Sequence, residues 1–280
     1  MALPHSHPIR RFARSRSAML GGLLIAGLLA VVVLAPLLAP HDPLEQSFPR
    51  QLQPPSWKFL LGTDEFGRDM LSRIIFGTRI ALGIGALAVG IAVALGVPVG
   101  LVAGYFGGML DIALMRTMDV LLAFPYLLLA LIVVTLLGFG LTNVMIAVGL
   151  VYVPQYSRIV RSVTLSVRER LFVEAAHAMG GSNARIMVRH VLPNCLAPII
   201  VQTTLSLGWA IVNAAGLSFL GLGAQPPSPE WGAMLSSGRE YMRNAPWITT
   251  FPGLAILLTA LGFNLLGDGL RDALDPRLKE

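Results

Sequence analysis

Charged residues are scarce in this chain of 280 residues. Only 13% are Asp, Glu, Lys or Arg, whereas average soluble proteins carry about 25%. At the same time, 55% of the residues are hydrophobic and the mean hydropathy is +0.70. A soluble globule of this size needs a charged surface that this sequence does not provide. The composition therefore indicates an integral membrane protein.

Lysine and cysteine are also nearly absent. Of the 21 basic residues only Lys58 and Lys279 are lysines, and neither lies in the G-x-x-x-x-G-K-[ST] pattern of a phosphate-binding loop. The chain is therefore not expected to hydrolyse ATP itself. Cys195 is the single cysteine, so we expect neither an intrachain disulfide nor a thiolate metal site. The arginines flank apolar segments, which argues against a nucleic-acid-binding surface.

Apolar runs without a charged residue recur along the whole chain. A helix needs about 20 such residues to cross a bilayer, and none of the runs shows the alternation of a strand. The runs are 17–40, 80–106, 120–139, 141–157, 196–222 and 248–267. We therefore predict an all-α polytopic membrane protein with six transmembrane helices.

The basic residues are unevenly shared between the two faces that six spans create. Fourteen of the 21 fall on the face that holds both termini and the 158–195 connection, and seven fall on the other. Because positive charge collects on the cytoplasmic side, both termini are predicted to be cytoplasmic. The predicted organisation is a cytoplasmic tail (1–16), a first span (17–40), an external segment (41–79), a five-helix domain (80–267) and a cytoplasmic C-tail (268–280).

The external segment ends in an amphipathic pattern between Phe66 and Gly77. Met70, Leu71, Ile74 and Ile75 are apolar, and Arg68, Asp69 and Arg73 are interspersed with them. This pattern predicts an interfacial helix that lies flat on the outer surface before the second span. Its purpose is either simple anchoring or contact with a partner protein.

Small residues form a stripe in the second apolar run. They are Gly96, Gly100, Gly104 and Gly108, preceded by Ala86, Gly90 and Ala94. Small residues four apart let helix backbones approach closely within a membrane. The stripe predicts close packing, either against another helix of this chain or across a subunit interface.

The runs contain no Asp, Glu, Lys, Arg or His, and this absence weakens the case for a proton-coupled carrier. Asn213 and Gln202 are polar residues within the fifth run. They are the candidates for lining a translocation path, with interhelical hydrogen bonding as the alternative. Asn143 and Asn264 are polar residues of other runs, and the same two alternatives apply to them.

The long 158–195 connection does not have the sequence of a polar linker. Residues 167–179 predict an amphipathic helix, which Gly180 and Gly181 end. Ser182 or Asn183 is predicted to cap a second short helix that reaches His190, and Leu192-Pro193 ends it. Exposed apolar residues beside arginines are typical of a docking surface. His177 and His190 have no cysteine or carboxylate constellation, so we expect local hydrogen bonds rather than a metal.

This connection resembles the EAA loop of ABC importer permeases. The matching residues are Glu174-Ala175-Ala176, Gly180 and, after nine intervening residues, His190-Val191-Leu192-Pro193. Histidine at position 190, where the general family pattern has isoleucine, resembles the peptide and nickel branch. Five further stretches are similar to the C-type permease subunit of dipeptide and oligopeptide importers: 61–64, 67–73, 217–223, 229–232 and 264–272.

The resemblance implies a type I ABC importer permease in the cytoplasmic membrane of a prokaryote. It implies three kinds of partner besides the bilayer: a second homologous permease, two ATP-binding subunits and an extracytoplasmic peptide-binding protein. ATP and Mg would be bound by the ATP-binding subunits, and this chain would carry no cofactor. The residues implied to dock the ATPase are Glu174, Ala175, Ala176, Gly180, His190, Leu192 and Pro193.

Several alternatives stay open at this point. Nickel or a glutathione-like compound could replace di- or oligopeptides as the substrate, because the binding protein largely selects it. An ATP-independent secondary carrier is the alternative class. No paired carboxylates, Ser/His/Asp set or metal cluster occurs at one membrane depth, so no catalytic residue is predicted and the chain is not expected to be an enzyme.

Overall fold

The computed structural model describes residues 15–274, and this part of the chain is helical, without a strand. A single isolated bridge pairs Thr63 with Asp69. The tail residues Arg10, Arg11, Arg14, Arg277 and Lys279, which entered the charge count, lie outside this range. The principal helices are α2 (Arg16–Leu38), α3 (Met70–Phe106), α4 (Gly108–Ala123), α5 (Tyr126–Leu137), α6 (Leu141–Arg168), α7 (Leu171–Ala178), α8 (Asn183–Ile186), α9 (Leu192–Phe219), α10 (Trp231–Gly238) and α11 (Trp247–Leu274).

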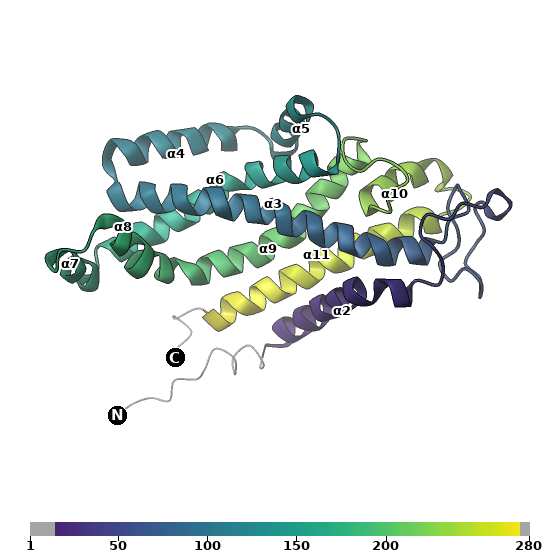
Figure 1. The fold of residues 1–280 in the computed structure, drawn as a ribbon, viewed down its shortest axis with the longest axis horizontal. Coiled ribbons are helices and arrows are strands. Elements are labelled where there is room, and N and C mark those ends of the chain that lie inside the picture. Colours follow the sequence, from purple (N-terminus) through teal and green to yellow (C-terminus); the bar gives the residue numbers. More distant parts are fainter. Residues whose placement is uncertain (1–14, 275–280) are drawn as a thin grey trace.

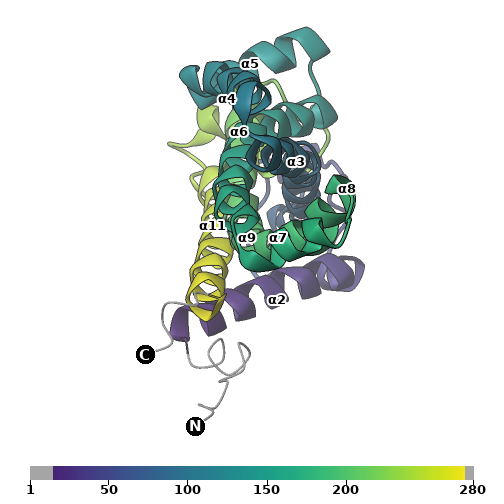
Figure 2. The ribbon, with the colours of Figure 1, turned by 90° about the vertical axis from the view of Figure 1, so that its left-hand side faces the viewer.

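The long helices run side by side (Figure 1). α3 packs along α6, α9 packs on α6 and α11, and α2 lies mainly against α11. The short helix α7 lies at one end of this bundle, and the segment between α2 and α3 lies at the opposite end with α10. The bundle therefore has two well-separated ends. The beginning of α2 and the end of α11 point toward the end that carries α7 (Figures 1 and 2).

The predicted glycine stripe packs α3 against α6 within the chain. A Cβ atom at Gly96 would lie 2.6 Å from the Tyr156 Cβ, and one at Gly100 would overlap the Ser157 carbonyl oxygen. Gly104 is equally close to Thr164. This contact does not extend along the whole stripe: Gly108 begins the next helix with open space around it, and Ala86, Gly90 and Ala94 are exposed on this chain.

Six spans are not confirmed. Four helices in the described range are long and apolar enough to cross a membrane, and a fifth span exists if α4 and α5 are taken as one bent element. The predicted 120–139 helix is broken: α4 and α5 meet at 97°. Phe124 is extended there because the ring of Pro125 disfavours a helical conformation in the preceding residue.

The predicted fourth and second spans also differ from the structure. The run that begins at Leu141 continues as one helix to Arg168 and is not among the helices that pass the length and hydropathy test. The separate interfacial helix over 66–77 was wrong, because α3 starts at Met70 and is continuous to Phe106. Asp69 caps that start by accepting a hydrogen bond from the Ser72 amide at 2.9 Å.

Candidate functional site

Helix α7 presents one face to the bundle and the other to the outside. Val173 and Ala176 are 1% and 4% exposed and pack into a cluster with Ile186, Val191 and other residues. Leu171 and Met179 are both 81% exposed, and Phe172 is 41% exposed. The amphipathic helix of the sequence analysis therefore exists, although it begins at Leu171 and not at residue 167. A break at Glu169 and Arg170 separates it from α6.

The residues implied to dock a partner divide between these two faces. Glu174 and Ala175 are exposed, and no ion pair among the described residues involves Glu174. Ala176 lies on the inner face and cannot contact a partner in this structure. A partner that approaches α7 meets leucine, phenylalanine and methionine side chains around one carboxylate.

A Schellman motif ends α7 at the predicted glycine. The Gly181 amide donates to the Ala176 carbonyl at 3.0 Å, and the Gly180 amide donates to the His177 carbonyl at 2.9 Å. Gly180 has φ +79°, in the left-handed region that favours glycine. A Cβ atom at Gly181 would lie 2.8 Å from the Ala176 carbonyl oxygen. Both glycines are therefore needed for this tight turn. We call the turn formed by Gly180 and Gly181 the elbow.

The chain after the elbow does not form the predicted separate helix. α8 leads through a π-helical turn, Met187–Val191, into α9, so the helical path continues from Asn183 to Phe219. Leu192-Pro193 does not end it, because these residues follow the π-helical turn directly and are the first two residues of α9. Ser182 occupies the N-cap position but its side chain makes no capping hydrogen bond.

The other residues of the motif lie along this continuous path. Leu192 is half-buried and packs against the cluster beneath α7. Pro193 is exposed, and His190 is half-buried with its carbonyl accepting from the Asn194 amide group at 2.7 Å. The elbow region is thus directly joined to α9.

Tyr105, at the end of α3, connects both sides of the elbow. Its hydroxyl lies 3.0 Å from His177 Nε2 on α7 and donates to Asn183 Oδ1 on α8 at 3.2 Å. The Tyr105 and His177 rings are stacked with centroids 6.1 Å apart. His177 therefore makes a hydrogen bond, but with a residue distant in the sequence and not with a local one as expected. No group of three or more potential metal ligands occurs in the part of the chain that the structure describes. Sequence patterns gave no sign of Tyr105, which is 72 residues away.

The two candidate path residues both make hydrogen bonds within the chain. The Asn213 amide group donates to the Tyr152 hydroxyl at 3.0 Å, which joins α9 to α6. Gln202 donates to Ser206 Oγ at 3.0 Å, one turn further along α9. Tyr156 of α6 adds a second polar contact between α6 and α9 by donating to Thr203 at 3.3 Å. The interhelical alternative is thus realised at Asn213, and Gln202 bonds within its own helix.

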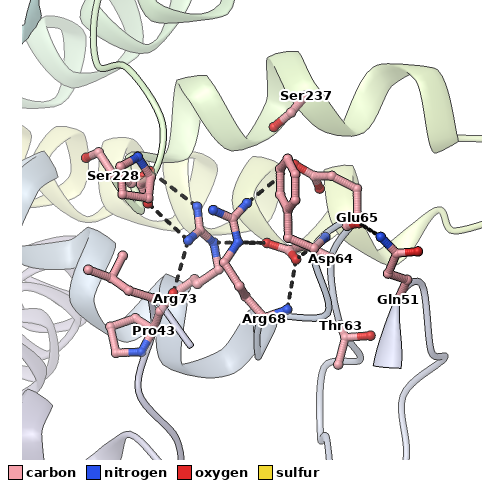
Figure 3. A network of polar contacts seen from close by, with 12 residues as sticks. Pro43, Gln51, Thr63, Asp64, Glu65, Arg68, Arg73, Ser228 and Ser237 are labelled. Carbon is pink, nitrogen blue, oxygen red and sulfur yellow. Dashed lines mark hydrogen bonds and ion pairs between the residues drawn. The ribbon is translucent and has the colours of Figure 1, made fainter. Parts of the chain in front are cut away.

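A buried ionic network holds the opposite end of the bundle together (Figure 3). Asp64 accepts hydrogen bonds from Arg68, and its carboxylate lies 3.4 Å from Arg73 Nε. Arg73 also donates to the carbonyls of Pro43, Pro227 and Ser228 at 3.1–3.3 Å. These contacts tie the segment after α2 to the start of α3 and to the loop before α10. Burial raises the pKa of Glu65, beside this network, above its usual range.

Comparison with known proteins places these features in a family. Residues 96–280 match the model of binding-protein-dependent transport system inner membrane components, and residues 9–55 match that of the N-terminal transmembrane domain of oligopeptide transport permease C. The chain belongs to this family of ABC importer permeases. The first model alone covers more than half of the permease.

Three curated relatives resemble the permease over nearly their whole length. The dipeptide transport system permease protein DppC of Alkalihalophilus pseudofirmus is 47% identical, covering 99% of this chain and 91% of that protein. The di/tripeptide transport system permease protein DppC of Pseudomonas aeruginosa is 48% identical, covering 99% and 95%. The glutathione transport system permease protein GsiD of Pectobacterium atrosepticum is 46% identical, covering 96% and 90%.

A solved structure supports the helical arrangement of the permease. An inward-facing conformation of the MetNI methionine ABC transporter aligns with a TM-score of 0.58 at 20% identity, covering 74% of this chain and 98% of that one. At this identity the likeness concerns the fold alone. It agrees with the type I permease fold that the sequence resemblance implied.

Proposed function

We propose that this permease carries di- or oligopeptides across the cytoplasmic membrane as one subunit of an ATP-driven importer. A second homologous permease, two ATP-binding subunits and an extracytoplasmic peptide-binding protein complete the importer. The ATP-binding subunits bind ATP and Mg, and this chain supplies no catalytic residue. The names of the DppC relatives support the peptide substrate.

The observation that carries this proposal is the outward-facing apolar side of α7 at the arginine-rich end of the bundle. Leu171, Phe172 and Met179 are exposed there, and an exposed apolar surface rimmed by polar residues marks a protein interaction site. In the proposed orientation this end is cytoplasmic, where the ATP-binding subunits lie. Six spans then require α6 to cross the membrane together with a bent α4–α5 span.

The elbow and the hydrogen bonds of Tyr105, here called the Tyr105 bridge, connect α7 mechanically to the membrane-spanning helices. Val173 and Ala176 fix the inner face of α7 on the cluster that continues into α9, and Tyr105 fixes it to α3. A displacement of α7 by an ATP-binding subunit is therefore transmitted to both helices. Asn213 and Gln202 are proposed to border the path that this movement opens, exchanging their present hydrogen bonds for contacts with the peptide backbone.

Uptake by the reconstituted importer tests this function. Proteoliposomes that hold this permease, its partner permease and the ATP-binding subunits should accumulate a labelled dipeptide only with the binding protein outside and ATP inside. Collapsing the proton gradient should leave uptake unchanged. Uptake that follows the proton gradient and ignores ATP would instead establish a secondary carrier.

Glutathione is a second candidate substrate, favoured by the 46% identity to GsiD. Identity does not separate the two, since the DppC relatives are within two percentage points. Competition decides between them in the same vesicles. Excess unlabelled dipeptide, and not glutathione, should suppress uptake of the labelled dipeptide if peptides are the transported class.

The Tyr105 bridge leads to a first prediction. Tyr105→Phe removes two hydrogen bonds to the elbow, each contributing about 0.5–1.5 kcal/mol, while the ring stays in place. Uptake should fall about two- to tenfold at an unchanged amount of protein in the membrane. Tyr241→Phe is the matched control, because Tyr241 makes no side-chain hydrogen bond among the described residues and should transport normally. Full uptake by Tyr105→Phe would show that the bridge is dispensable.

A further inference from the structure

Arg79 supplies a hydrogen bond that a proline removes from α2. Pro36 lies inside α2 and has no amide hydrogen, so the Val32 carbonyl lacks the partner that a regular helix provides. The Arg79 side chain, on α3, donates from Nε to this carbonyl at 2.7 Å. The contact positions the guanidinium group at the junction of the two helices.

Most of the hydrogen-bonding capacity of Arg79 is left over. The Nε–Val32 bond is its single hydrogen bond among the described residues, and no ion pair there involves it. The side chain is exposed, and its Cζ lies 5.5 Å from the centre of the Phe76 ring. Four further N–H groups of the guanidinium therefore remain available to an anion.

These groups face a large groove between the end of α2 and the start of α3. Its volume is about 730 Å³. Apolar residues line most of it, among them Pro36, Ala39, Phe76 and Ile80. The titratable groups are Arg79, His41 and Asp42. His41 Nδ1 lies 3.7 Å from Asp69, so its ring is directed toward that carboxylate, whereas Asp42 is exposed.

The helix that forms one side of the groove, α2, carries exposed side chains that suit contact with lipid chains. Val33 and Leu37 of α2 are 73% and 83% exposed, and α2 is one of the candidate membrane spans. Arg79 directly precedes the uncharged run that begins at Ile80. An arginine at such a border lies at the depth of lipid headgroups. A ligand in this groove therefore meets the Arg79 guanidinium group, the Asp42 carboxylate and an apolar lining.

We propose that this groove binds a phospholipid with a zwitterionic headgroup, phosphatidylethanolamine. The phosphate binds the free N–H groups of Arg79, since guanidinium recognises phosphate through paired hydrogen bonds. The ammonium group pairs with the Asp42 carboxylate, and one acyl chain lies along Val33 and Leu37. The proposal requires α2 and α3 to cross the bilayer, and it is independent of which substrate the importer carries.

Native mass spectrometry of the intact importer tests the proposal. The complex is delipidated and then incubated with equal amounts of phosphatidylethanolamine and phosphatidylglycerol. We expect one retained phosphatidylethanolamine, and at least a fivefold weaker retention with Arg79→Gln. Asp42→Asn should remove the preference for phosphatidylethanolamine over phosphatidylglycerol. Arg239→Gln, which changes an exposed arginine outside the groove, is the matched control and should bind like the wild type.

A double variant separates lipid binding from the structural role of Arg79. Pro36→Ala restores an amide hydrogen to pair with the Val32 carbonyl, so that Arg79 is no longer needed there. Pro36→Ala with Arg79→Gln should lose the lipid as fully as Arg79→Gln alone. Recovery of the lipid in the double variant would overturn the proposal. So would a wild-type complex that retains no lipid or prefers phosphatidylglycerol, including the case in which a partner subunit covers the groove.

Discussion

Replacement of Gly180 by valine is expected to uncouple the importer. Gly180 has φ +79°, and a residue with a branched Cβ costs about 1–2 kcal/mol in a left-handed backbone. The helix end must then unwind or move, which re-aims the exposed side chains of α7. Dipeptide uptake in proteoliposomes should fall at least fivefold, and stimulation of ATP hydrolysis by loaded binding protein should fall with it.

Three further variants show whether backbone strain is the cause. Asparagine tolerates the left-handed region better than other residues with a side chain, so Gly180→Asn should retain most transport. Gly27→Val adds the same side chain in a helix where a Cβ also meets nothing within 4 Å, and it should transport normally. Glu174→Ala should have a small effect, because an exposed ion pair contributes about 0–1 kcal/mol. Near-normal uptake by Gly180→Val at a normal protein level would mean that the elbow does not couple.

The second large effect is expected at the other end of the molecule. Asp64 is 2% exposed, and both Arg68 and Arg73 are 3% exposed. Asp64→Ala leaves these guanidinium groups without their shared carboxylate. Removal of one partner from a buried ion pair costs about 3–5 kcal/mol. We expect a strongly lowered unfolding temperature in detergent and little protein in the membrane.

Glu45→Ala is the matched control for this loss. Glu45 is an exposed carboxylate on the same segment, and its replacement should change stability by less than about 0.5 kcal/mol. If Asp64→Ala were as stable as Glu45→Ala, the network would not be what holds the segment after α2 against α3 and the loop before α10.

The predictable features depended on local patterns. Spacing of small residues predicted the close-packing face of α3, although not that α6 is its partner, and two consecutive glycines predicted the turn at Gly180. The effect of the prolines on the helices could not be predicted from local patterns. Pro98 and Pro154 lie inside continuous helices, whereas Pro125 separates α4 from α5. Each proline disfavours a helical conformation in the residue before it, so the presence of a proline alone did not show which of these helices is interrupted.

Contacts between residues far apart in the sequence were likewise not predictable from sequence patterns. The similarity of residues 61–73 to peptide permeases drew attention to Asp64, Arg68 and Arg73, but not to the carbonyls 154 or more residues away that Arg73 binds. Tyr105 and its partners on α7 and α8 form a second such case. In both cases the residues became connected only when the helices were assembled.

Photo-cross-linking tests most directly whether α7 couples this permease to the ATP-binding subunits. A photoreactive amino acid replaces Met179, which is 81% exposed on α7, and in a second variant Trp57, which is 98% exposed at the opposite end. In the assembled importer, Met179 should cross-link to an ATP-binding subunit and Trp57 should not. Cross-linking of Trp57 to an ATP-binding subunit, with none from Met179, would contradict both the orientation and the coupling role of α7.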